Sequence, residues 1–254
     1  MKLISVNGKK ITLYSSIDEL PIVNFQKYNK YLLIDSGIGS DANDIDDHIV
    51  RVAKFIKLGD SSNALKELQN MRQNLYMINN EISPKHMAFA ALIHSIDGKE
   101  VTDLSDENLQ AILKDLNKAR RSALLDLFLR LKKKLDAELE LYFPNSSNAK
   151  EKSTYDKLKQ RTLLTIDKIL YNSEVQAQID LIDDELFKLY SPKSFIGEQS
   201  AEIQHDKAFE SACLLIAQKS SLDAKKMTVL QFYSALENIK KQLDAEAKAY
   251  KKVK

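Results

Sequence analysis

The chain has 254 residues, of which only 6 are glycine and 4 are proline, and it has no tryptophan. A nucleotide-binding α/β fold or an all-β sandwich needs many turn glycines, so this composition predicts a mainly helical protein. The 38 basic and 36 acidic residues nearly cancel, which gives no overall charge that would favour nucleic acid. The single cysteine, Cys213, excludes a disulfide framework and a cysteine-based zinc site.

Residues 2–14 predict a β-hairpin. Asn7-Gly8 is the dipeptide typical of a type I′ turn, and it is flanked by two short runs rich in β-branched residues. An isolated two-stranded hairpin is marginal in water. We therefore expect this hairpin to lie on the helices or to pair with a strand from another chain.

Helical spacing of apolar residues then predicts five helices before residue 117. They cover about residues 22–37, 41–58, 60–82, 84–93 and 105–116, with Asp97-Gly98 as a turn before the fifth. In the second helix we expect an inward stripe of Ile49, Val52, Phe55 and Ile56. In the third we expect Leu65, Leu68, Leu75, Tyr76 and Ile78 to face inward.

Two long rods follow, at residues 118–143 and 150–171, separated by a turn at residues 144–148. We expect them to fold back as an antiparallel helical hairpin. Its seam would join Leu124, Phe128, Leu131 and Leu135 to Leu158, Leu163, Ile166 and Leu170. Three further helices are expected at residues 173–190, 201–220 and 228–254.

These elements predict a fold class that is all-α, a helical bundle with a small N-terminal β-hairpin. We expect three segments. Residues 1–116 would hold the β-hairpin and a helical bundle, residues 117–190 the long helical hairpin and the following helix, and residues 191–254 the C-terminal helices with a basic tail. No apolar stretch approaches the roughly 20 residues of a membrane span, and the N-terminus has no apolar signal segment. We therefore expect no membrane partner.

Residues 35–41 are rich in glycine, but acidic flanks would repel phosphate, and Ile45 breaks a calcium-loop pattern that starts at Asp41. We interpret them as a loop between helices. The adjacent carboxylates Asp46-Asp47 and Asp183-Asp184 point in different directions on a helix, which makes them poor acid–base pairs.

The remaining candidate residues also lack a catalytic or metal-binding pattern. No histidine pair is spaced as in H-E-x-x-H, so we interpret the histidines as packed or surface residues: His48, His86, His94 and His205. Cys213 lies in an apolar run and is interpreted as a core residue. The sequence therefore predicts no catalytic, cofactor-binding or metal-binding residues and no enzymatic activity.

Charge is uneven along the chain. Residues 35–60 carry six Asp and three basic residues, residues 118–143 carry seven basic and four acidic residues, and residues 240–254 carry six Lys and two acidic residues. Solvated helix faces explain this pattern. Two alternatives are acidic and basic surfaces that meet in a head-to-tail assembly, and a basic face towards DNA.

Three stretches carry a resemblance to proteins of phages that infect Bacteroidetes. They are residues 19–40 (ELPIVNFQKYNKYLLIDSGIGS) with the hairpin before them, residues 72–76 (RQNLY) and residues 226–236 (KMTVLQFYSAL). Together they resemble a virion component of a crAss-like podovirus over about half of the chain. The resemblance carries no active-site residues across.

The resemblance implies a non-enzymatic structural protein, a subunit of a stacked ring in the phage tail or head–tail connector near the portal. It implies location in the virion tail after synthesis in the host cytoplasm. The implied partners are copies of the same chain, the portal and other tail proteins. Two alternatives remain at this point: an assembly chaperone, and a DNA-associated protein acting through its basic helix and tail.

Overall fold

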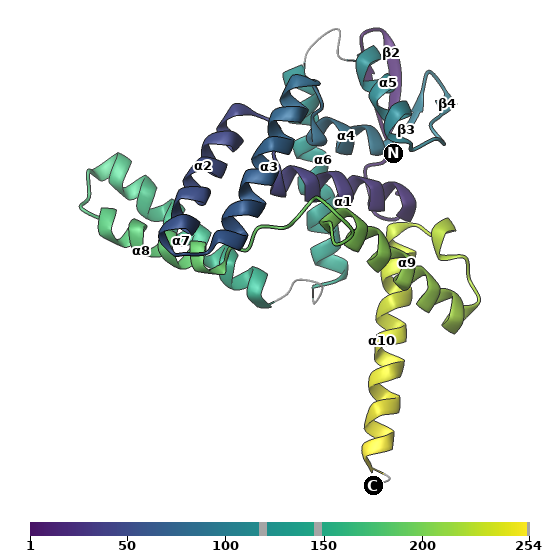
Figure 1. The fold of residues 1–254 in the computed structure, drawn as a ribbon. Helices are drawn as coiled ribbons and strands as arrows, with labels where there is room; N and C mark the ends of the chain where they lie inside the picture. The colour runs from purple at the N-terminus through teal and green to yellow at the C-terminus, as the bar shows by residue number, and fades with distance from the viewer. Residues whose placement is uncertain (117–120, 145–148, 253–254) are drawn as a thin grey trace. The chain divides into compact units, whose positions relative to one another are not determined.

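A computed structural model describes residues 1–116, 121–144 and 149–252. Within these residues the chain forms ten α-helices, one short 3-10 helix and a four-stranded antiparallel sheet (Figure 1). The predicted fold class, mainly helical with a small N-terminal β element, is confirmed.

The chain divides into two compact units. The first comprises Met1–Leu139 and Lys193–Lys254, and the second comprises Glu140–Pro192. The predicted segments 1–116 and 191–254 thus share one unit, to which most of the first long rod also belongs.

The sheet belongs to the first unit and has the order β1-β2-β3-β4. Its strands are β1 (Lys2–Val6), β2 (Lys9–Leu13), β3 (Ile93–Ile96) and β4 (Lys99–Glu100). The predicted hairpin is confirmed, with positive φ angles at Asn7 and Gly8 as a type I′ turn requires.

The expectation of a helix over residues 84–93 is wrong at its end, because α4 (Pro84–Ala91) stops before β3 begins. β3 pairs with β2, with Ile11 opposite Ile96. A short apolar run fits a buried strand as well as a helix, and here the tertiary pairing decides. The hairpin therefore finds its third strand in its own chain and needs none from another.

The core of the first unit lies around α1 (Ile22–Gly37), which packs against α4 and carries the buried Phe25 and Tyr28. α5 (Asp106–Leu116) contributes the buried Leu109 and Leu116. α6 (Arg121–Tyr142) buries the predicted stripe Leu124, Phe128, Leu131 and Leu135. The ring centroids of Tyr28 and Phe128 lie 6.2 Å apart, which fixes α6 against α1.

The C-terminal part of this unit contains α9 (Ala201–Ser220), the 3-10 helix η1 (Ala224–Lys226) and α10 (Val229–Lys252). The amide of Ile22 donates to the carbonyl of Met227, and the amide of Val229 donates to the carbonyl of Leu20, both at 2.9 Å. These bonds join the start of α10 to the start of α1. Beyond the buried Ile239, residues 240–248 are exposed, and α10 runs on past the other helices of the unit (Figure 1).

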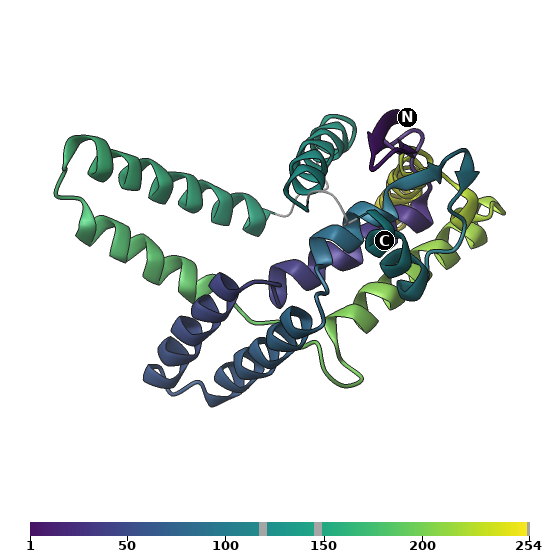
Figure 2. The same cartoon turned by 90° about the horizontal axis from the view of Figure 1, so that it is seen from above.

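The second unit is a helical hairpin of α7 (Ala149–Tyr171) and α8 (Gln176–Leu189). Arg161 of α7 pairs with Asp183 of α8 at 2.5 Å, and Lys168 pairs with Gln176 at 2.5 Å. These pairings run in opposite directions along the two helices, so the helices are antiparallel (Figure 2). α7 thus pairs with α8 within this unit, whereas the sequence predicted the rod at 118–143 as its partner. Residues 145–148 of the predicted turn lie outside the described residues.

Candidate interaction surface

The candidate surface lies on a second helical hairpin, formed by α2 (Ala42–Lys57) and α3 (Ser61–Asn79) in the first unit. The Asp41 side chain accepts hydrogen bonds from the amides of Asn43 and Asp44, and Asp44 completes a capping box. Residues 35–41 are therefore the end of α1 and the loop that leads to α2, as interpreted from the sequence.

The inner side of this hairpin carries several buried polar groups beside the buried Phe55 and Ala64. His48 is 1% exposed and Glu67 is 0% exposed, and His48 Nδ1 lies 2.5 Å from the Glu67 carboxylate. The carbonyl of Ile38, at the end of α1, lies 2.9 Å from His48 Nε2 and accepts a 2.8 Å bond from Asn74 Nδ2. A carbonyl oxygen can only accept, so Nε2 of His48 carries a proton and donates it.

Further polar contacts complete this inner side. Asn70, also buried, donates to the carbonyl of Lys193 at 3.0 Å. Arg51 Nε donates to the Glu67 carboxylate at 3.3 Å, which gives the buried charge a basic partner. Removing one member of a buried charged cluster is strongly destabilising, because the other is left uncompensated. The hairpin is thus held to the rest of its unit by hydrogen bonds and charge.

The outer side of the hairpin is apolar. Ile56 is 63% exposed, and seven other large apolar side chains of these helices and their connecting loop are exposed as well: Ile49, Val50, Leu58, Leu65, Leu68, Leu75 and Tyr76. Buried polar groups and clustered exposed apolar groups are the informative departures from ordinary burial. This hairpin shows both, with buried polar groups on its inner side and exposed apolar side chains on its outer side.

Ile49 and Leu68 lie on the same side of the hairpin. Each directly follows a residue of the His48–Glu67 contact, so each is rotated by about 100° from that contact in the same sense about its own helix axis. The two helices run in opposite directions, because a short loop joins them. Equal rotations about the axes of two antiparallel neighbours bring both side chains to one side of the pair. Ile56 and Leu75, seven residues further along each helix, lie on that same side.

This arrangement corrects the expectation for the second and third helices. The helical spacing was right and Phe55 is buried as expected, but six other apolar side chains are exposed instead of facing the core: Ile49, Ile56, Leu65, Leu68, Leu75 and Tyr76. A second pattern with the same spacing was present in α3, namely Glu67, Asn70 and Asn74. The polar stripe of α3 faces inward because Asn74 and Asn70 donate hydrogen bonds to the backbone carbonyls of Ile38 and Lys193. The apolar stripe of the same helix therefore faces outward.

α7 has a similar exposed stripe in the second unit. Its exposed side carries Tyr155, Leu158, Leu163, Ile166, Ile169 and Leu170. The side towards α8 is instead joined by charge, with Arg161 bonded to Asp183 and Lys157 paired with Glu185. The pKa of the Glu185 carboxyl is lowered by its hydrogen bond from Lys157. The helix therefore uses its polar side within the unit and leaves its apolar side outward.

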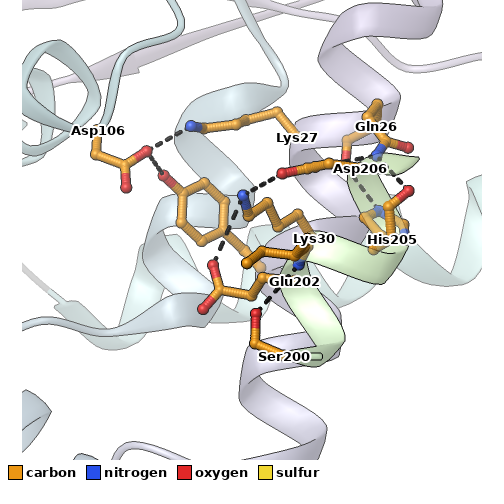
Figure 3. A network of polar contacts seen from close by, with 10 residues as sticks. Gln26, Lys27, Lys30, Asp106, Ser200, Glu202, His205 and Asp206 are labelled. Carbon is orange, nitrogen blue, oxygen red and sulfur yellow. Dashed lines mark hydrogen bonds and ion pairs between the residues drawn. The ribbon is translucent and has the colours of Figure 1, made fainter. Parts of the chain in front are cut away.

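A polar network joins α1 to α9 on one side and to α5 on the other (Figure 3). Lys30 Nζ donates to Asp206 at 2.7 Å and lies 3.7 Å from Glu202. Asp106, at the start of α5, accepts from Lys27 and, at 2.7 Å, from the Tyr31 hydroxyl. Burial and this hydrogen bond raise the pKa of Tyr31. We assign the network a structural role, because its charges satisfy one another.

The other candidate residues lie apart from one another. His205 is 3.4 Å from the carbonyl of Gln26, and His94 is 3.1 Å from the Tyr14 hydroxyl. His86 lines a cavity of about 770 Å³ between the ends of α3, α4 and α5.

Cys213 is buried, as interpreted, and burial raises the pKa of its thiol. Among residues 1–116, 121–144 and 149–252, no three His, Cys, Asp or Glu residues are grouped as a metal site.

None of the helices in the described part of the chain is long and apolar enough to cross a membrane. Comparison of the chain with protein-family models, with curated proteins and with solved structures found no match.

Proposed function

We propose that this chain is a non-enzymatic structural subunit of a phage virion, one of several copies in a ring of the tail or head–tail connector. The observation that carries the proposal is the α2–α3 hairpin, with buried His48 and Glu67 and exposed Ile49, Ile56 and Leu68. An apolar face of this extent marks a surface for another protein.

A second apolar surface supports assembly of many copies. The exposed stripe of α7 lies in the other unit of the chain. A subunit with two different contact surfaces can join copies head to tail, and such contacts close into a ring when the rotation between subunits permits. The partners we propose are copies of this chain, the portal and neighbouring tail proteins, with location in the virion tail.

The resemblance of residues 19–40, 72–76 and 226–236 to crAss-like phage proteins adds the particular setting. In the structure, residues 21–22 and 227–229 meet where α1 and α10 begin. Two of the segments that carry the resemblance therefore meet within the first unit.

Quantitative mass spectrometry of purified particles of the encoding phage tests the proposal. We expect a copy number in the range of a ring, at a fixed ratio to the portal protein. A protein that is abundant in infected cells and absent from particles would favour an assembly chaperone. Negative-stain electron microscopy of the purified chain would show whether it forms rings by itself.

A matched pair of variants tests whether the two apolar surfaces are needed for incorporation of the chain into particles. Leu68→Ser removes an exposed apolar side chain from the face, so assembly into particles should fall while the thermal melting temperature stays unchanged. Leu158→Ser makes the same change on α7 and tests the second surface separately. If neither variant changes incorporation, neither apolar surface is an assembly contact.

A further inference from the structure

We propose that α2 pairs with α2 of a second copy of this chain, antiparallel and about a two-fold axis near the middle of the helix. The proposal rests on the exposed side of α2 and not on the virion role, so the two can fail separately. This contact between identical surfaces covers Ile49 and Ile56 of the α2–α3 hairpin and leaves the exposed Leu65, Leu68 and Leu75 of α3 for the head-to-tail contact that a ring requires.

Four exposed residues define the line of contact. Asp46, Val50, Ala53 and Lys57 follow one another at intervals of four, three and four residues, so they lie along one side of α2. All four are exposed. The line has opposite charges at its two ends and apolar side chains between them, while Ile49 and Ile56 extend the apolar part along one side.

The charges select the orientation of the partner. An antiparallel α2 places Asp46 opposite Lys57 of the partner subunit, and the two-fold axis repeats that pair. It also places Val50 opposite Ala53 of the partner subunit. A parallel α2 would place Asp46 against Asp46 and Lys57 against Lys57, which gives two repulsions in place of two attractions.

The centre of the line favours close packing of two helices. Ala53 has the smallest side chain on it, and the distance between packed helix axes falls when the side chains at the contact are small. Burial of Ile49, Val50 and Ile56 supplies the driving force, because burying apolar surface is the dominant favourable term in association. The charged ends then fix orientation and register more than affinity.

Sedimentation equilibrium of the full chain tests this pairing. Asp46→Lys and Lys57→Asp each create two like-charge contacts, so we expect each to weaken the dimer about tenfold. The double variant Asp46→Lys with Lys57→Asp exchanges the signs and should restore the parental dimer. Asp126→Lys makes the same change at an exposed position of α6 and should leave the dimer unchanged.

Ala53→Gln provides a test that does not depend on charge. The longer side chain stands at the exposed centre of the contact, so it should abolish the dimer while thermal melting shows an intact fold. A chain that is monomeric at all concentrations overturns the proposal. A double reversal that dimerises no better than the single variants overturns it as well, because the pairing of Asp46 with Lys57 would then be wrong.

Discussion

Leucine-to-alanine variants on α6 and α7 test whether the apolar side of α7 is exposed, as in the structure, or packs against α6, as the sequence predicted. Leu131 on α6 is 3% exposed, whereas Leu163 on α7 is 54% exposed. Burying a leucine contributes about 1.5–3 kcal/mol, and the cavity left by alanine adds to the loss. We therefore expect Leu131→Ala to lower the free energy of unfolding by about 3 kcal/mol.

Leu163→Ala should lower the free energy of unfolding by less than about 0.5 kcal/mol, because surface changes away from special features are small. Urea unfolding of each variant, followed by circular dichroism at 222 nm, measures both values. The expected difference is larger than the error of such a comparison. Equal large losses would refute this reasoning, because they would show that Leu131 and Leu163 share the seam predicted from the sequence.

Three further predictions concern the polar groups. Glu67→Gln removes the buried carboxylate that contacts His48 and Arg51, so unfolding in urea should show a loss of about 3 kcal/mol. A loss below about 1 kcal/mol would show that the buried cluster is not charged. Burial acts to raise the pKa of Asp106, but hydrogen bonds from Lys27 and Tyr31 outweigh it and hold that pKa below its usual range. The stabilising contribution of Asp106 is therefore fully present above the ordinary carboxyl pKa and is lost as pH falls through the lowered pKa. In a plot of melting temperature against pH, Asp106→Asn should therefore make the acid side flatter. An acid side that is unchanged in the variant would contradict this. A thiol reagent at neutral pH should label Cys213 slowly in the folded chain and rapidly in denaturant, because burial raises the pKa of the thiol; equal rates would place Cys213 at the surface.

The sequence by itself determined most of the secondary structure. The scarcity of glycine and the helical spacing predicted a mainly helical chain, and Asn7-Gly8 predicted the hairpin turn that the structure has. These features depend on local backbone preferences, which neighbouring residues in the chain settle. The stripe on α6 was also assigned correctly, because Leu124, Phe128, Leu131 and Leu135 are all buried.

Tertiary structure alone decided which stripe of α2 and α3 faces inward and which helix partners α7. Periodicity shows that a helix has an apolar side, but it does not show what that side meets. In α3 the carbonyls of Ile38 and Lys193 take hydrogen bonds from Asn74 and Asn70, which turns Leu68 and Leu75 outward. In the same way, β2 offered an open edge that made residues 93–96 a strand instead of the end of a helix. Both outcomes depend on backbone groups far away in the sequence, and buried groups of that kind must find hydrogen-bond partners.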